Sequence, residues 1–520
     1  MLKTHFMQRC AATVKMSFGN AIKCQTNYRA AERMLWGLCT ASLCSMVGCA
    51  VGPDFVRPSK PSVEQYTYGE EPSTTASADG EVQHFEPGAD IVGDWWRLFN
   101  SDKLDTAVRE AVAQNQNLQA AQASLRQSQA QLQAGYGIFY PQIDAGFSAS
   151  RQRSSPARIN GNVTSSVFNL FTLSAVVSYT VDVFGGQRRT IENLQSLVDY
   201  QRYTVLATYL TLTGNIVNAN IARAAYAAEI EATQQLVDSL REEVKITEAQ
   251  AQAGTTPYSA LASLQTQLAA IEATLPPIKQ KLSQTDHLLA TLSGRAPADW
   301  QPQQISLTEL ALPENLPLTL PSEVVRQRPD ILEAEALLHS SSAQIGIATA
   351  ALFPSFTING GYGVQNTSTG NLFNSNSKFW SIGGGVVAPL FHGGTLYYQR
   401  EAAIEGYQQS LSNYRQTVLG GIAQVADTLR ALEHDAEALQ AQSNALNSAE
   451  EALNLILTNY RAGTVNYLQV LIATTQYHQA KIGYLEAKAQ RLQDTVALYI
   501  ALGGGWWNGG DFVPANPAAG

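Results

Sequence analysis

The chain repeats itself, because four short motifs occur twice in the same order and at almost the same spacing. The paired positions are separated by 213, 208, 209 and 209 residues, and they are Pro141 and Pro354, Gly185 and Gly393, Gly254 and Gly463, and Gly294 and Gly503. A duplication of this length, built from elements that cannot bury themselves alone, predicts one shape made from two similar halves. We expect a first repeat at 93–294, a linker at 295–321, a second repeat at 322–503 and a tail at 504–520.

The composition excludes several classes of protein. Charged residues make up 15% of the chain, well below the roughly 25% of typical soluble domains. The net charge of −9 and the pI of 5.4 argue against nucleic acid as a partner, which would require a basic surface. No cysteine follows Cys49, so a disulfide framework is excluded for the rest of the chain.

The N-terminus reads as a secretory signal over residues 1–48. Arg29 and Arg33 precede an apolar run at 34–48, which is shorter than the ~20 residues needed to span a bilayer. Cys49 directly follows a glycine, and this arrangement resembles a bacterial lipoprotein signal whose cysteine is acylated. Ala50 is not the aspartate that marks inner-membrane retention in that class, which indicates the outer membrane. The alternative is an ordinary signal with a coincidental cysteine. Residues 49–92 are rich in proline and predict a lipidated, extended tether.

Very long helices follow from the spacing of apolar residues. Between Tyr397 and Tyr460 an apolar residue recurs at ten consecutive seven-residue steps, which is typical of a coiled coil. A helix over 395–461 would be about 100 Å long, and 187–253 matches it in the first half. Shorter helices are expected at 103–138 and 257–292, where Pro276-Pro277 must kink or break the second one. Two short helices stacked end to end would equal one long helix.

Two glycine turns reverse the chain at one end of the long helices. They are Gly254-Thr255 and Gly463-Thr464, where glycine supplies the left-handed backbone angle that ends a helix.

Alternating strands are expected at the other end, at about 143–152, 171–183, 356–364 and 379–389. Residues 171–183 carry apolar side chains at odd positions and mostly polar ones at even positions. Ten-residue strands of this kind are typical of a membrane β-barrel, although a soluble antiparallel sheet with one wet face shows the same period. Four strands cannot close a barrel, so subunits would complete it. Two copies would give eight strands, filled by their own side chains, so a conducting barrel needs three copies or more.

Several motifs together resemble the TolC-like outer-membrane efflux factors, and within them the OprM- and NodT-like lipoproteins. The motifs are the Cys49–Pro58 segment, Trp95-Trp96 with Phe99, Arg328-Pro329-Asp330-Ile331, and the Tyr460–Thr464 turn with Tyr467-Leu468. The resemblance implies a mainly α fold with a membrane β-barrel, in which a homotrimer combines a twelve-strand barrel with a periplasmic α-barrel. It also implies a periplasmic adaptor protein, an inner-membrane pump, and a passive exit duct for small molecules. Gly254, Thr255, Gly463 and Thr464 would then be the periplasmic tips that dock onto the adaptor.

The resemblance also indicates a periplasmic gate close to the second tip. Gln469 and Ile472 fall where members often carry carboxylates that ring the entrance, and both are uncharged here. That departure puts cation binding and an acidic gate in doubt. Tyr460 and Arg461 remain as candidate gate contacts, with stabilisation of the hairpin turn as the alternative interpretation.

No enzymatic chemistry is predicted. The seven histidines are scattered without metal-ligand spacing, and the glycine runs lack the Lys-Ser/Thr of a phosphate loop. We therefore expect no cofactor beyond the covalent lipid on Cys49, and no enzyme. Two alternatives stay open: a polypeptide secretion duct of the type I kind, and a structural periplasmic coiled-coil lipoprotein. The sequence does not name the cargo.

Overall fold

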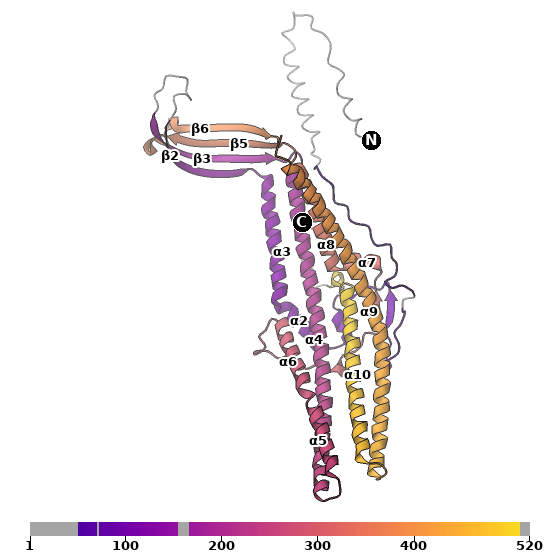
Figure 1. The fold of residues 1–520 in the computed structure, drawn as a ribbon. Helices are drawn as coiled ribbons and strands as arrows, with labels where there is room; N and C mark the ends of the chain where they lie inside the picture. The colour runs from indigo at the N-terminus through magenta and orange to yellow at the C-terminus, as the bar shows by residue number, and fades with distance from the viewer. Residues whose placement is uncertain (1–49, 70–71, 154–165, 510–520) are drawn as a thin grey trace, which may run out of the picture. The chain divides into compact units, whose positions relative to one another are not determined.

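The computed structural model describes residues 50–69, 72–153 and 166–509. The expected signal at 1–48, the acylation site Cys49 and residues 510–520 lie outside this range. Within it, a four-stranded sheet lies at one end and two helical hairpin turns lie at the other (Figure 1). No helix of these residues is long and apolar enough to cross a membrane.

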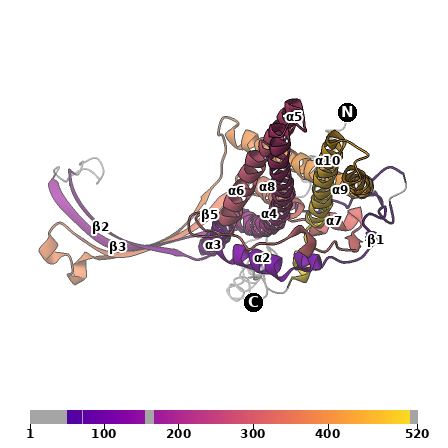
Figure 2. The same ribbon diagram turned by 90° about the horizontal axis from the view of Figure 1, so that it is seen from below.

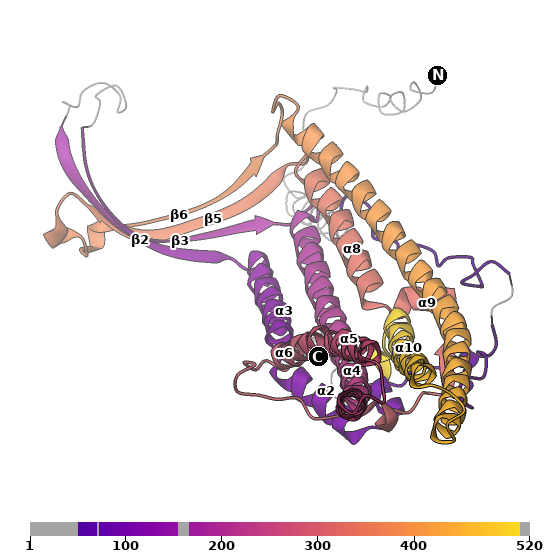
Figure 3. The same ribbon diagram turned by 60° about the horizontal axis from the view of Figure 1, so that its bottom comes forward.

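Two helices of 67 residues each dominate the structure, α4 (Gly186–Gln252) and α9 (Thr395–Arg461). Both begin after a glycine in the left-handed conformation, with φ of 79° at Gly185 and 85° at Gly394. The shorter helices are α2 (Asp102–Gln114), α3 (Gln116–Gly135), α5 (Tyr258–Glu272), α6 (Leu275–Leu292), α7 (Pro321–Gln327), α8 (Pro329–Ala350) and α10 (Tyr467–Ala501). Figure 3 shows α3, α4, α8 and α9 side by side in that order below the strands.

The expected single helix at 103–138 differs from the structure in two respects. The chain breaks at Asn115, and a 3-10 turn (Tyr136–Phe139) replaces the last helical turn. The break between α5 and α6 lies just before Pro276-Pro277, which occupy the first turn of α6. Proline fits there because the first turn has no intrahelical acceptor for its missing N–H group.

The short helices form composite rods, and one polar residue joins each pair. The Asn115 side chain caps α3 by accepting the Leu118 N–H at 3.0 Å and donates to the carbonyl of Leu292, the last residue of α6, at 2.8 Å. In the second half Arg328 precedes the first residue of α8, and its guanidinium donates to the carbonyl of Ala501, the last residue of α10, at 2.6 Å. Both devices satisfy helix-end groups that would otherwise lack partners.

The strands β2 (Gln142–Arg153), β3 (Val167–Val181), β5 (Ser355–Asn366) and β6 (Lys378–Val387) form one antiparallel sheet in the order β2-β3-β5-β6. Their register puts Phe147 opposite Leu173, Ala175 opposite Tyr362, and Tyr362 opposite Trp380. Opposite residues share a face of a sheet, so the apolar side chains of all four strands gather on one face. The Gly-rich strands of the second half therefore keep the alternation as well.

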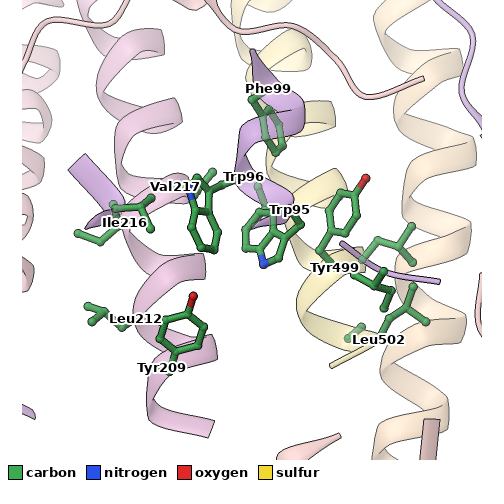
Figure 4. Close-up of a cluster of buried hydrophobic side chains, with 14 of the residues drawn as sticks. Trp95, Trp96, Phe99, Tyr209, Leu212, Ile216, Val217, Tyr499 and Leu502 are labelled. Carbon is green, nitrogen blue, oxygen red and sulfur yellow. The ribbon is translucent and has the colours of Figure 1, made fainter. Parts of the chain in front are cut away.

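The centre of the packed helices is an aromatic cluster (Figure 4). Trp95 belongs to a short 3-10 helix (Trp95–Phe99) and stacks on Tyr499 of α10 with ring centroids 5.3 Å apart. Trp96 and Phe99 are buried beside it. The cluster joins both repeats, because α4 contributes Ile216 and Val217 from the other side.

The expected tether is extended but not free. Its strand β1 (His84–Pro87) pairs in parallel with β4 (Asn315–Leu318), which lies inside the expected linker. Arg491 of α10 is buried and donates to Gln83 at 3.2 Å. The start of the expected tail is packed as well, since the Trp506 indole donates to the Gln327 carbonyl at 2.8 Å. The β1 and β4 strands and the start of the tail therefore pack against the middle of the helices, and we call these segments the belt.

Candidate functional site: the hairpin tips and the sheet–helix junction

The two hairpin turns have the same backbone design. The Thr255 N–H donates to the Gln250 carbonyl and the Thr464 N–H to the Asn459 carbonyl, each at 3.0 Å, and each Thr hydroxyl donates to the same carbonyl. Gly254 and Gly463 have φ of 75° and 72°. This is the Schellman arrangement, which needs a residue in the left-handed region. All four predicted tip residues are exposed.

A cavity of about 530 Å3 lies between the two tips. Its walls come from four helices and include Gln250, Leu264, Tyr460, Tyr467 and Leu471. Tyr460 and Tyr467 meet edge to face, with ring centroids 5.7 Å apart. Burial raises the pKa of Tyr467, helped by the nearby Glu243 carboxyl. The phenol therefore stays protonated and available as a hydrogen-bond donor.

The four candidate gate residues divide between this cavity and the open surface. Tyr460 lines the cavity, whereas Arg461 is exposed at the last position of α9. Gln469 is exposed in the first turn of α10, and its backbone N–H is capped by Asn466. Ile472 is 50% exposed, next to the equally exposed Leu468 one turn earlier. The face of α10 that carries Ile472 is therefore apolar and uncovered in one chain.

The two hairpins also touch along their length, and Figure 2 shows their ends from below. Leu236, Leu240 and Leu264 of the first hairpin form an apolar cluster against which Tyr467 and Leu471 of the second are packed. Farther from the tip the contact becomes polar: Gln267 donates to Thr475 at 3.1 Å, and Thr233 meets His478 at 3.1 Å.

The residues that follow Cys49 are fixed at the junction of sheet and helices. The Val51 N–H donates to the carbonyl of Phe184, between β3 and α4, at 3.0 Å. The buried Arg189 bonds Asp54 at 2.6 Å and Glu192 at 2.7 Å. A Cβ atom on Gly185 would lie 2.5 Å from the Cα of Ala50, so glycine is needed for this close approach.

The part of the chain that the structure describes holds no group of three or more His, Cys, Asp or Glu residues that could hold a metal ion.

The outer membrane efflux protein family model matches residues 107–295 and 320–504. The chain therefore belongs to the outer membrane efflux protein family, and it is an outer-membrane component of an efflux system. The match falls in two segments, one in each half of the chain.

Curated relatives agree with this assignment. The pyoverdine export outer membrane protein OpmQ of Pseudomonas putida is 29% identical over 416 residues, covering 79% of this chain and 88% of the relative. The cation efflux system protein CusC of Escherichia coli O6:H1 is 26% identical over 469 residues, covering 89% and 97%. The probable efflux pump outer membrane protein TtgC of Pseudomonas putida is 27% identical over 463 residues, covering 88% and 93%.

Solved structures share the fold. The outer-membrane channel OprN has a TM-score of 0.79 at 23% identity, covering 88% of this chain and all of that one. The Campylobacter jejuni CmeC outer membrane channel has a TM-score of 0.80 at 21% identity, covering 89% and 96%.

Sequence reasoning missed residues that hold distant segments together, such as Arg189, which bonds Asp54, and Arg491, which bonds Gln83. Their partners lie far away in the sequence, so no local spacing indicates them.

Proposed function

We propose that three copies of the chain form a lipid-anchored exit duct for small molecules across the outer membrane and periplasm. The observation that carries this proposal is the sheet. Its apolar face is open to solvent in the single chain, with Ile143, Trp380 and Ile382 each more than 70% exposed. A large uncovered apolar surface marks contact with lipid or protein.

Closure of a barrel requires further copies, because β2 and β6 each have one neighbour in this sheet. Open edges in lipid would leave backbone groups without hydrogen bonds, at several kcal/mol each. Pairing β6 of one copy with β2 of the next removes the edges. Three copies would give twelve strands, wide enough to keep an interior channel, whereas eight strands would fill themselves.

Acylation of Cys49 is supported by the position of the next residue. Ala50 lies beside Gly185, where the sheet meets the helices. A lipid on the preceding cysteine would thus start at the level where the apolar sheet face ends. The bonds of Val51 and Arg189 would keep the anchor at that level.

The tips are the surface we propose for the periplasmic adaptor, and through it for an inner-membrane pump. They lie at the end farthest from the sheet (Figure 1) and are exposed. The cavity between them, with Tyr467 as a donor and Leu471 as an apolar wall, offers a partner both a hydrogen bond and a place for a side chain.

In the proposed assembly the inner-membrane pump, and not the duct, selects the cargo. Relatives of similar identity are named for pyoverdine, for cations and, in the case of another TtgC, for toluene. Equal resemblance to ducts for such different compounds supports a permissive passage for small molecules, with selection by the pump.

Native mass spectrometry of the detergent-extracted protein tests the assembly. We expect three chains, each beginning at Cys49 and carrying acyl groups, and a Cys49→Ala variant that loses the added lipid mass. A monomer or dimer would overturn the shared barrel and favour the envelope-spacing lipoprotein. A trimer without lipid would overturn only the anchor.

A further inference from the structure

The contact between the two hairpins contains a buried acidic residue about half-way between the tips and the tryptophan cluster. Glu229 of α4 is 6% exposed and lies on the α4 face that packs on α10. Toward the tip the same contact is made by leucines, and toward the cluster it is made by Ala225, Ala489 and Leu492. The Glu229 carboxyl is thus buried in an interface that also contains the polar contact between Thr233 and His478.

The surroundings of Glu229 disfavour its charge. Burial and the Glu486 carboxyl of α10 raise the pKa of Glu229 to about 7, while Lys281 of α6 acts in the opposite direction. Lys281 is itself placed over the ring of Tyr226, with its Nζ 5.6 Å from the ring centroid. Of the two carboxyl groups only that of Glu229 is buried in the contact, whereas Glu486 is exposed on the neighbouring helix α10.

Two further titratable groups of α10, His478 and Lys481, lie near Glu229. The Thr233 hydroxyl donates to the Glu229 backbone carbonyl at 2.7 Å, so its oxygen accepts from the His478 ring at 3.1 Å. Burial and Lys481 lower the pKa of His478, which keeps the ring neutral near pH 7.

Two acidic groups of the neighbouring helices are paired with arginines of α4. Asp286 of α6 bonds Arg223 at 2.7 Å, and Glu272 of α5 bonds Arg241 at 2.7 Å. Neither cation is left to neutralise Glu229.

We propose that Glu229 and Glu486 form a pH-responsive clasp, which holds the α9–α10 hairpin against α4 when Glu229 is protonated and loosens it when Glu229 ionises. The clasp rests on the proposed duct, because its role there is to set how readily the second hairpin moves away from the first. Loosening would free the tip that carries Tyr460 and Ile472.

The direction of the pH effect on hairpin packing follows from the linkage between protonation of Glu229 and packing. A carboxyl whose pKa is raised in the packed state stabilises packing most at low pH, below its ordinary value of 4.5, and this contribution is lost as pH rises to about 7. The His478 ring acts the other way, since packing disfavours its protonation as pH falls. Between pH 5.5 and 8.0 the Glu229 effect amounts to at least about tenfold in the packing equilibrium.

Hydrogen exchange measured by mass spectrometry on purified full-length protein tests the clasp. Amide protection of residues 467–486, corrected for intrinsic exchange rates, is compared at pH 5.5 and pH 8.0. We expect protection to fall at least about tenfold at the higher pH in the natural protein and to show no fall in Glu229→Gln, where only the opposite effect of His478 remains. Glu242→Gln is the matched control, because Glu242 is exposed on the same helix, and it should respond like the natural protein.

The proposal is overturned if Glu229→Gln keeps the full pH response or if the natural protein shows none. Should Glu229→Gln fail to fold, Glu486→Gln removes the repulsion from α10 and is expected to reduce the response without abolishing it, because burial of Glu229 is the larger cause; an unchanged response would overturn the proposal. Native mass of the same samples reports the trimer separately, so a failed duct and a failed clasp are distinguishable.

Discussion

At the scale of single residues, the two repeats meet one structural need with different chemistry. Each composite rod has a joint where one helix ends and another begins, and each joint needs a side chain that reaches both. Asn115 supplies an acceptor and a donor, whereas Arg328 is tied to Asp330, Gln424 and the last carbonyl of α10. Both residues are buried, but Arg328 is charged and makes more hydrogen bonds, so it should matter more for stability.

Replacing Arg328 should lower the free energy of unfolding more than replacing Asn115 does. Arg328→Met should lower the free energy of unfolding by about 3 kcal/mol, because it leaves buried acceptors without a charged donor. Asn115→Ala should cost about 1–2 kcal/mol, the usual loss for a helix N-cap residue. Denaturant unfolding of the detergent-solubilised protein measures both. Equal effects of the two substitutions would contradict the interpretation of Arg328 as the stronger joint.

At the scale of elements, the sequence predicts what local period controls and misses what distant contact controls. The seven-residue period places α9, and the repeat places its counterpart α4, within one residue of their ends, and alternation with the repeat locates the four strands within four residues. The break at Asn115 and the strand pair β1–β4 could not be predicted, because both depend on a partner about 180 to 230 residues away. The tip residues follow from glycine turns, but the cavity between tips needs the three-dimensional packing of four helices.

The turn at the second tip should tolerate asparagine but not alanine. Gly463→Ala places a Cβ atom at φ of 72° with nothing within 4 Å, so its cost of about 1–2 kcal/mol is backbone strain alone. Gly463→Asn should cost less, because asparagine adopts this conformation more readily. Amide exchange at residues 459–466 measures local opening. Similar exchange in both variants would show that the turn is not fixed by its backbone angle.

The two faces of the sheet should respond differently to charge. Ile382→Lys puts an ammonium group on the apolar face and should cost about 2–4 kcal/mol if that face meets lipid. Ser381→Lys, one residue earlier, lies on the opposite face and should be nearly neutral. Yield of folded protein in isolated outer membranes compares them. Equal tolerance would place the sheet outside the bilayer core.

At the scale of the whole molecule, assembly decides what the uncovered surfaces do. One chain leaves both the sheet face and the α10 face with Leu468 and Ile472 exposed. In the proposed trimer the first would meet lipid and the second would meet its copies around the axis. The resemblance to the efflux factors indicated that carboxylates are missing at Gln469 and Ile472. Which contacts take their place depends on how exposed these side chains are in the folded chain, and the sequence alone does not give that.

The duct entrance should therefore be closed by apolar contact instead of by a charged ring. Three copies of Ile472 with Leu468 would exclude water from a narrow opening, as hydrophobic constrictions do in channels. Ile472→Asp would place three like charges together, and their mutual repulsion should raise the resting conductance in planar bilayers about tenfold or more. It should also make the conductance sensitive to divalent cations, which carboxylates bind. Ile472→Leu, which keeps the apolar contact, should conduct as little as the natural trimer. An aspartate variant with unchanged conductance would move the gate away from α10, toward Tyr460 and the cavity between the tips.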